Sequence, residues 1–264
     1  MVRSVVLLAV TALFGLGLTL PAAALDPNGE LPARFREGRL AKQSLSVGYP
    51  NEGRQVRAKR LGNTRELHVR GSSRSRAYGH PALVLMLVRS AADVAKAVPG
   101  SVLFVGDLSA EDGGPLSGHR SHQSGRDADV GFYLTDLHGK RVVSHEYVAF
   151  DGDGRSKDGS GYLFDDERNW ALVESWAKDR RAGLSHIFVS DPLRARLLDF
   201  ARRNPKHARH LEDAIRLLKQ PEHGEPHDDH FHVRITCPKE QLEICRNESK
   251  IADARIVSER PPAP

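Results

Sequence analysis

Apolar residues recur at helical spacing along residues 81–98, which is the clearest pattern in the chain. Pro81 suits the first turn of a helix, and Pro99 followed by Gly100 ends the pattern. We therefore predict a helix with one buried face, and the residues expected on that face are Leu83, Leu87, Ala91 and Val94.

Three further segments show helical signals, at residues 165–178, about 193–203 and about 208–219. The second has a strong start, because Asp191 can cap the helix and Pro192 suits its first position. The first is amphipathic, and its apolar side is expected to pack into the core.

Short apolar or alternating runs predict strands at residues 101–106, 129–134, 185–189 and 231–236. Residues 43–79 hold shorter alternating pieces separated by turn residues. No internal repeat or long linker divides the chain. The order of the segments fits an α+β fold, a single domain with a central, largely antiparallel sheet flanked by helices and loops.

Residues 1–24 have the three parts of a signal peptide. Arg3 supplies the positive charge, residues 5–20 form the apolar run, and the alanines at 22–24 offer a cleavage site. An uncleaved membrane anchor is the alternative, but the run is short for a span and ends at Pro21. We expect export, with no membrane span left after cleavage.

Composition suggests the remaining boundaries. Residues 25–44 are rich in Pro, Gly and Arg without a clear period, which predicts an extended, poorly structured segment. Residues 246–264 are charged and end in Pro-Pro-Ala-Pro, which predicts a disordered tail. Residues 45–245 then form the domain.

The chain has two cysteines, Cys237 and Cys245. In an exported protein a disulfide closing this small loop fits better than two free thiols, although the sequence alone leaves the pairing open. One bridge cannot hold a chain of 264 residues, so a disulfide-scaffold fold is excluded.

The net charge of +5 and the isoelectric point near 9.3 suit an anionic partner outside the cell. The basic residues are spread along the chain, and aromatic residues make up only 6% of it, without an interleaved stacking pattern. We therefore do not expect nucleic acid as a partner. Attraction to an acidic polymer of the cell wall explains the positive charge as well as nucleic-acid binding would.

Two short stretches, residues 118–129 and 227–232, hold five of the thirteen histidines and four acidic residues. A single histidine is more often a surface or capping residue than a ligand, but this grouping changes the balance. Imidazole and carboxylate together are the ligand set of a catalytic zinc that keeps one position open. We expect the two stretches to meet and build one metal site.

In the second stretch, His230 and His232 share one face if the segment is a strand, because side chains alternate. One imidazole can then bind the metal while the other stands beside the bound water. His227 precedes them in the turn. The apolar residues Phe231, Val233 and Ile235 are expected to point into the core behind the sheet.

In the first stretch, His122 and Asp129 are seven residues apart, and Ser124 with Gly125 lets the chain bend between them. With His232 they would give two nitrogen ligands and one oxygen ligand, which leaves the fourth tetrahedral position for water. The zincin H-E-x-x-H motif and the serine G-x-S-x-G motif are both absent from the sequence.

The stretch Gly118 to Asp129, together with His230-Phe-His232, resembles the penicillin-insensitive murein endopeptidase family. This family belongs to the wider group of lysostaphin-like and D-alanyl-D-alanine metallopeptidases, which share a His-x6-Asp … His-x-His pattern. Further blocks in the correct order extend the resemblance over residues 45–245, namely Val105–Ser109, Gly113–Gly114, Ile187–Val189 and Arg234–Pro238.

The resemblance implies a periplasmic, zinc-dependent endopeptidase that cuts D-alanyl–meso-diaminopimelyl cross-links in peptidoglycan. His122, Asp129 and His232 would be the zinc ligands. His230 would be the base or would stabilise the transition state, and His227 would support it.

The resemblance also makes His119 a further candidate ligand. In the family, this histidine can join a second metal with an Asp-Gly-x-His run. The counterpart here, residues 151–154, lacks the histidine, so His119 is expected to orient the site.

Two alternatives remain open at this stage. A D-Ala carboxypeptidase or dipeptidase of the same fold would use the same ligands, because the shape of the pocket decides between endo- and exo-cleavage. A non-catalytic, zinc-containing module that binds the cell wall is the other alternative. The presence of His227 and His230 beside a full ligand set favours an enzyme.

Overall fold

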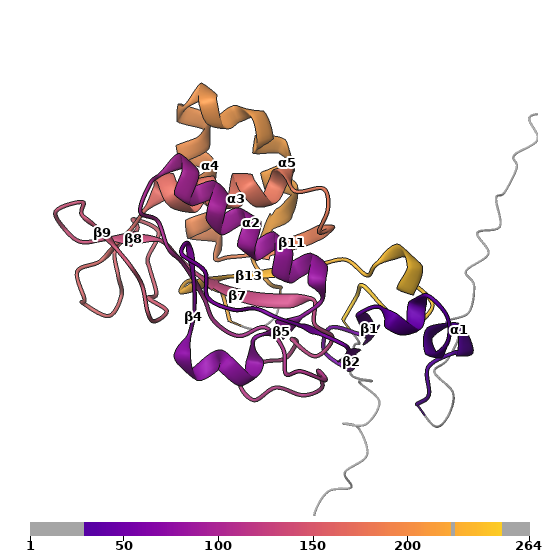
Figure 1. Cartoon of the computed structure of the whole chain (residues 1–264). Coiled ribbons are helices and arrows are strands. Elements are labelled where there is room, and N and C mark those ends of the chain that lie inside the picture. The colour runs from indigo at the N-terminus through magenta and orange to yellow at the C-terminus, as the bar shows by residue number, and fades with distance from the viewer. Residues whose placement is uncertain (1–28, 223–224, 250–264) are drawn as a thin grey trace, which may run out of the picture.

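The computed structural model describes residues 29–222 and 225–249 (Figure 1). The expected signal peptide lies outside the described residues, as does the expected tail from residue 250 onwards. Within the described ranges, no helix is both long enough and apolar enough to cross a membrane.

A six-stranded mixed sheet forms the centre of the fold. Its three inner pairings, β11 with β13, β13 with β7 and β7 with β6, are antiparallel, and the pairings of β12 and β4 at its two edges are parallel. Helices lie between the two strands of each parallel pair, as parallel pairing requires. In spatial order the strands are β12 (Leu218–Lys219), β11 (Leu184–Phe188), β13 (His230–Ile235), β7 (Asp127–Gly131), β6 (Leu103–Val105) and β4 (Leu67–Val69).

Four helices cover one face of this sheet, and loops with the 3-10 turn η2 (Gly71–Arg76) cover the other (Figure 1). Phe231 of β13 points toward the helices and meets the ring of Trp176 at 5.6 Å between centroids. The α+β prediction is therefore confirmed. The helices are α2 (Pro81–Ala97), α3 (Asp166–Lys178), α4 (Asp191–Arg203) and α5 (Leu211–Leu217).

The last predicted helix is too long. Residues 205–210 form a 3-10 turn, η3, before α5 begins at Leu211. Leu218 and Lys219 leave the helix and pair with β11 as its parallel edge strand, so the apolar pattern continues past the end of the helix. The first helix agrees with its prediction to within one residue.

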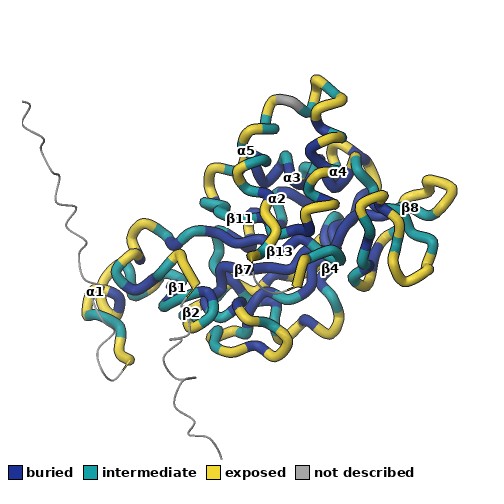
Figure 2. Tube along the Cα trace, turned by 180° about the vertical axis from the view of Figure 1, so that it is seen from behind, coloured by how far each residue is buried: buried dark blue, intermediate teal, exposed yellow. Residues whose placement is uncertain are grey.

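The strand predicted at residues 129–134 is two strands. β7 ends at Gly131, and β8 (Leu134–Thr135) pairs with β9 (Arg141–Val142) and β10 (Leu163–Phe164) in a separate small sheet. At the break, the backbone amide of Tyr133 donates to the side chain of Asn169 on α3. Figure 2 shows β7 and β13 buried along most of their length.

Residues 25–44 were expected to be extended, but their described part contains two helical turns, α1 (Ala33–Arg36) and η1 (Leu40–Lys42). The apolar Phe35 explains the difference, because it is 1% exposed in a second small core with Leu45, Val47 and Ile244. The hairpin of β1 (Leu45–Gly48) and β2 (Gly53–Val56) lies over this core. Two shorter strands, β3 (Lys59–Arg60) and β5 (Tyr78–Gly79), also pair with each other.

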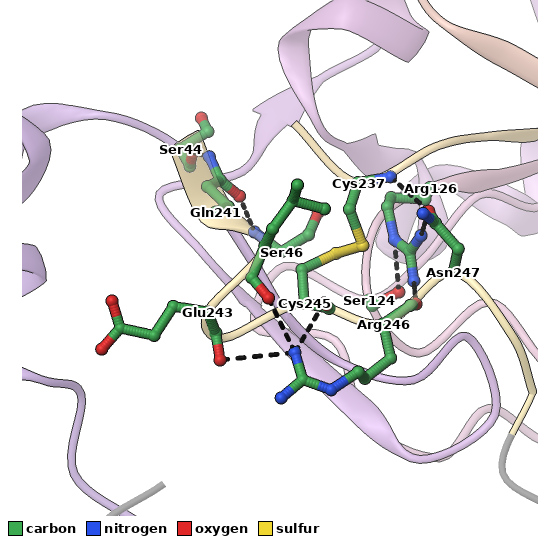
Figure 3. Close-up of a disulfide and its surroundings, with 11 residues drawn as sticks. Ser44, Ser46, Ser124, Arg126, Cys237, Gln241, Glu243, Cys245, Arg246 and Asn247 are labelled. Atoms are coloured by element: carbon green, nitrogen blue, oxygen red, sulfur yellow. Dashed lines mark hydrogen bonds between the residues drawn. A yellow bond between two sulfur atoms is a disulfide. The ribbon is translucent and has the colours of Figure 1, made fainter. Parts of the chain in front are cut away.

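Cys237 and Cys245 form a disulfide, as expected (Figure 3). Inside the loop that it closes, the 3-10 turn η4 (Lys239–Gln241) carries Gln241 toward β1. The side chain of Gln241 accepts from the amide of Ser46 and donates to the carbonyl of Ser44, both at 2.8 Å. The bridged loop therefore fastens the N-terminal hairpin to the domain.

Candidate metal centre

The two histidine-rich stretches meet on the face of the sheet opposite the helices. β7 and β13 pair antiparallel, with Asp129 directly opposite His232 and Asp127 directly opposite Arg234. Residues opposite each other in an antiparallel pair share one face. His230 follows on the same face of β13, as the alternation of the sequence predicts.

The carboxylate of Asp129 lies at the centre of the cluster. Three imidazole nitrogens surround its Oδ1 atom: Nε2 of His122 at 3.2 Å, Nε2 of His230 at 3.3 Å and Nδ1 of His232 at 3.4 Å. On the other side, Nδ1 of His119 lies 3.4 Å from Oδ2. Four histidines from segments about a hundred residues apart thus converge on one carboxylate.

The fold holds His122 in a conformation that few residues adopt. Its φ angle is +68°, in the left-handed region. Its ring is completely buried, and Nδ1 donates to the carbonyl of Leu108 at 2.5 Å, which leaves Nε2 as a lone pair toward Asp129. Gly125 makes the bend possible, since it has a φ of +74° and a Cβ there would lie 1.9 Å from the side chain of Gln55.

Two atoms at the centre lack partners. Nε2 of His122 and Oδ1 of Asp129 are buried and make no hydrogen bond among the described residues. Buried polar atoms are normally satisfied, and an unsatisfied pair of electron donors is what a bound cation resolves. The donor atoms of His119, His122 and Asp129 lie within 4.8 Å of one another, which fits a metal ion. Imidazole and carboxylate are ligands that zinc accepts.

The candidate ligands form two overlapping sets, one predicted from the sequence and one found as a cluster in the structure. The sequence predicts His232 as the third ligand, whereas the tightest cluster contains His119 instead. Both imidazoles face Asp129 at 3.4 Å, on different oxygens. His232 is the more deeply buried of the two, with 9% of its side chain exposed against 21% for His119.

A buried carboxylate holds His232 from behind. Oδ1 of Asp127 accepts from Nε2 of His232 at 2.8 Å and from Nε of Arg234 at 2.6 Å. Burial disfavours the charge on Asp127, but Arg234 and His232 outweigh it and hold the pKa of Asp127 below its usual range. The alternation of the strand predicts that Asp127 shares a face with Asp129, but the sequence does not identify His232 as its partner.

Asp107 plays the corresponding part for His119. Its Oδ2 atom accepts from Nε2 of His119 at 2.8 Å and from Arg76 at 3.1 Å. Burial opposes the charge, yet the hydrogen bond from His119 leads a set of contacts that lower the pKa of Asp107 to about 2. Its signal in the sequence was its place just after the buried strand β6.

His230 is held between two carboxylates. Nδ1 lies 2.6 Å from Oδ1 of Asp229, so Nε2 is the atom directed at Asp129. Burial favours the neutral ring, but the charge of Asp129, together with the hydrogen bond and charge of Asp229, raises the pKa of His230 to about 10. The ring of Tyr147 stacks on His230 with centroids 4.7 Å apart.

His227 lies beside both histidines of β13. Its ring centroid is 5.0 Å from that of His230 and 5.2 Å from that of His232. Like His122 it has a positive φ, +56°, and its Nδ1 donates to the carbonyl of Glu225 at 2.9 Å. Burial first, and then the charges of His232 and His230, lower the pKa of His227 to about 4.

Comparisons with known proteins identify the family of this chain. A family model described as penicillin-insensitive murein endopeptidase matches residues 46–255. The chain belongs to this family. Curated relatives named penicillin-insensitive murein endopeptidase support the assignment. The protein from Haemophilus influenzae is 32% identical over 193 residues, which cover 68% of this chain and 58% of the relative.

Two further relatives of the same name show a similar match. The Pectobacterium atrosepticum protein is 30% identical over 181 residues, covering 66% of this chain and 58% of the relative. The Escherichia coli O9:H4 protein is 29% identical over 174 residues, covering 64% of this chain and 57% of the relative. The chain therefore spans less than three fifths of these murein endopeptidases.

Not every residue of the two stretches joins the site of this murein endopeptidase family member. Asp228 forms an ion pair with Lys157 at 2.5 Å, outside the cluster of four histidines. In the Asp-Gly run at residues 151–154, the carboxylate of Asp151 accepts from the backbone amide of Arg155 at 2.8 Å and closes its own turn.

Proposed function

We propose that this protein is a zinc-dependent murein DD-endopeptidase, which hydrolyses D-alanyl–meso-diaminopimelyl cross-links in peptidoglycan. One observation carries the proposal. Nε2 of His122 and Oδ1 of Asp129 face each other, are buried and make no hydrogen bond among the described residues, and two more imidazoles surround the same oxygen. Family membership and the printed names of the relatives support murein as the substrate.

His122, Asp129 and His232 would hold the zinc. His122 and His232 approach the same oxygen of Asp129, and each has its other ring nitrogen fixed by an acceptor, the carbonyl of Leu108 or the carboxylate of Asp127. Such outer partners orient ligand histidines in metal sites generally. His119 remains a candidate additional ligand on the opposite oxygen.

Zinc held by these residues would supply a Lewis acid, which polarises a carbonyl and makes water more acidic. The chain's own part is proton transfer. Nε2 of His230 faces the centre while Asp229 holds Nδ1. The charge of Asp129 raises the pKa of His230 and keeps the ring protonated, so a cation bound to Asp129 would have to offset that charge. His230 could then accept a proton from water and return it to the leaving amine. General base catalysis by one such imidazole contributes roughly 10²–10⁴-fold.

His227 would support the substrate rather than move the proton. Its lowered pKa keeps the ring neutral, and Nδ1 is already engaged with the carbonyl of Glu225. Nε2 is therefore a hydrogen-bond acceptor beside His230. A peptide N–H group of the substrate is the natural donor for it.

The proposal includes a periplasmic location, with residues 1–24 as the signal peptide and residues 45–245 as the catalytic domain. Peptidoglycan lies outside the cytoplasmic membrane, so the enzyme must be exported to meet it. The positive net charge would favour contact with the anionic wall.

Digestion of purified muropeptide dimers, with and without a chelator, tests the proposal directly. We expect mass spectrometry to show that the protein releases monomers from the dimers and that the chelator blocks this release. Loss of terminal D-Ala alone would instead support a D-Ala carboxypeptidase or dipeptidase. Binding of the dimers without any chelator-sensitive change would support a wall-binding module.

Two variants separate metal binding from proton transfer. His122→Ala should abolish both zinc content and hydrolysis, whereas His230→Ala should keep the metal and lose activity. His138→Ala is a matched control, because His138 is an exposed residue in the turn between β8 and β9. Full activity in either site variant would contradict the assignment.

A further inference from the structure

Tyr147 lies in the loop between β9 and β10 and forms one wall of the site. Its ring is stacked on the imidazole of His230, with centroids 4.7 Å apart and planes inclined by only 27°. Phe104 of β6 meets the same tyrosine ring edge-on at 5.5 Å. The tyrosine is thus fixed between the sheet and the histidine to which the proposed function gives the proton transfer.

The hydroxyl group of Tyr147 lies against the backbone of Gly106, in space that the missing Cβ atom leaves free; we call this contact the glycine seat. A Cβ atom on Gly106 would lie 1.6 Å from the hydroxyl oxygen and 2.6 Å from Cζ of Tyr147. Gly106 is not one of the glycines with positive φ, so its backbone conformation does not require glycine. The space that it leaves for Tyr147 gives a physical reason for glycine at this position.

The hydroxyl group makes no hydrogen bond of its own among the described residues, and it is buried. It therefore cannot reach a substrate without a change in its surroundings. The part of Tyr147 that contacts the catalytic group is the face of its ring. This separates a steric role of the residue from a chemical one.

We propose that Tyr147 is a positioning residue, which holds the ring plane of His230, and that Gly106 provides the space that lets it do so. Asp229 fixes only the Nδ1 end of the imidazole, at 2.6 Å, and one hydrogen bond leaves the ring free to tilt. Stacking restrains that tilt and keeps Nε2 directed at Asp129. The inference deepens the proposed function and rests on it for the role of His230.

Substitutions at position 147 test whether the ring or the hydroxyl matters. Tyr147→Phe keeps the stack and should retain most of kcat on muropeptide dimers. Tyr147→Leu removes the stack and should lower kcat by roughly 10–100-fold with little change in KM, because small misplacement of a catalytic group has effects of this size. A loss with Tyr147→Phe as large as with Tyr147→Leu would overturn the proposal.

The glycine seat gives a second, reciprocal test. Gly106→Ala should push Tyr147 away from His230 and lower kcat in the same way. Adding Tyr147→Phe should restore part of the loss, since the closest atom becomes Cζ at 2.6 Å instead of the oxygen at 1.6 Å. Thermal unfolding should first show that the single and double variants are both folded. If the double variant then regains no activity, Gly106 does not act by leaving space for Tyr147.

Tyr133 offers a matched control. Its hydroxyl group, like that of Tyr147, is buried and lacks a partner among the described residues. An arginine lies over each ring, Arg168 over Tyr133 and Arg70 over Tyr147, but only Tyr147 stacks on His230. Tyr133→Leu should lower the melting temperature and leave kcat of the folded enzyme unchanged. An equal loss of kcat in Tyr133→Leu would show that the effect at Tyr147 is general destabilisation.

A spectroscopic readout keeps this inference separate from the proposed function. In ¹H NMR of the metal-free protein, the ring of Tyr147 should shield the carbon-bound protons of His230. Tyr147→Leu should remove that shift and Tyr147→Phe should keep it. If wild-type protein fails to cleave the dimers, the proposed function fails, while unchanged His230 shifts in Tyr147→Leu would overturn the stacking contact itself.

Discussion

Oδ1 of Asp127 lies 2.8 Å from Nε2 of His232 across the β7–β13 pair. Because a carboxylate accepts, the proton of the neutral imidazole is on Nε2, and Nδ1 is left as a lone pair toward Asp129. Arg234 binds the same oxygen of Asp127 at 2.6 Å and keeps it in place. The side chain that decides which nitrogen of His232 can bind a metal is therefore Asp127.

Asp127→Asn should weaken zinc binding by about 10–100-fold, the usual effect of losing an outer carboxylate partner. The amide has the same shape but no charge to favour the Nε2–H form of His232. Competition with a chromogenic chelator measures the affinity on purified protein without any need for activity.

Asp179→Asn is the matched control for this prediction. The Asp179 carboxylate is also mostly buried and accepts from an arginine, Arg89, but it lies outside the histidine cluster. The Asp179→Asn variant should lower the free energy of unfolding and leave the zinc affinity unchanged. Equal zinc affinities in wild type and Asp127→Asn would remove the role given to Asp127.

His119 and His232 are the two candidates for the proposed third zinc ligand, and their alanine variants should differ. His232→Ala should lose the bound zinc, because His232 shares Oδ1 of Asp129 with His122. His119→Ala should retain close to one zinc per chain with reduced affinity, because His119 faces Oδ2 from a more exposed position. Metal analysis after dialysis gives the stoichiometry.

The opposite pattern, with zinc lost in His119→Ala and kept in His232→Ala, would assign the metal to the cluster of His119, His122 and Asp129. His210→Ala serves as the control for removal of a histidine as such. His210 is the N-cap residue of α5, lies outside both stretches, and pairs only loosely with Asp213 at 3.9 Å. Its zinc content should equal that of wild type.

Much of the fold could be predicted from local patterns. The helix at residues 81–97 has its apolar face, its proline start and its stop within one segment, so nothing distant was needed to find it. The break after Gly131 could not be found in this way. It depends on Asn169, which lies on another helix and binds the backbone of Tyr133 at 2.9 Å.

The candidate site also has one part that local sequence patterns predict and another that they do not. His230 and His232 share a face because strands alternate, and the sequence shows this directly. The partners inside the two stretches, Asp127 and Asp229, lie beside the histidines that they orient. Asp107 and Tyr147 could not be predicted, because they come from other loops. Their nearness to the site is a result of tertiary packing, which leaves no periodic signal in the sequence.

The pH dependence of stability should include a contribution from His80, the N-cap of α2. Nδ1 of His80 accepts from the amide of Ala82, and burial first, with Arg126 second, lowers the pKa of His80 to about 4 from 6.5. At pH values between 4 and 6.5, His80 is therefore protonated in the unfolded chain but neutral in the folded protein. The free energy of unfolding should fall as the pH drops from 6.5 toward 4, by up to about 3 kcal/mol from this group.

His80→Asn isolates this contribution, since asparagine caps a helix well and does not titrate. Urea unfolding at pH 7 and at pH 4.5 measures the free energy for both proteins. The variant should lose less stability between the two pH values than wild type does. Parallel curves for the two proteins would show that His80 is not the group responsible.

Reduction of the Cys237–Cys245 disulfide should lower the free energy of unfolding by about 2–3 kcal/mol, the loop-entropy value for cysteines eight residues apart. The effect should reach the N-terminal hairpin, because Gln241 inside the loop binds Ser44 and Ser46. Urea unfolding with and without a phosphine reductant measures it.

The double variant Cys237→Ser/Cys245→Ser should show the lower stability at once and should not respond to the reductant. Gln241→Ala, with the disulfide intact, separates the second contribution, since it removes the contacts to β1 but leaves the loop closed. If reduction costs no more than Gln241→Ala does, the disulfide acts only by presenting Gln241. A larger cost on reduction shows that closing the loop stabilises the fold in its own right.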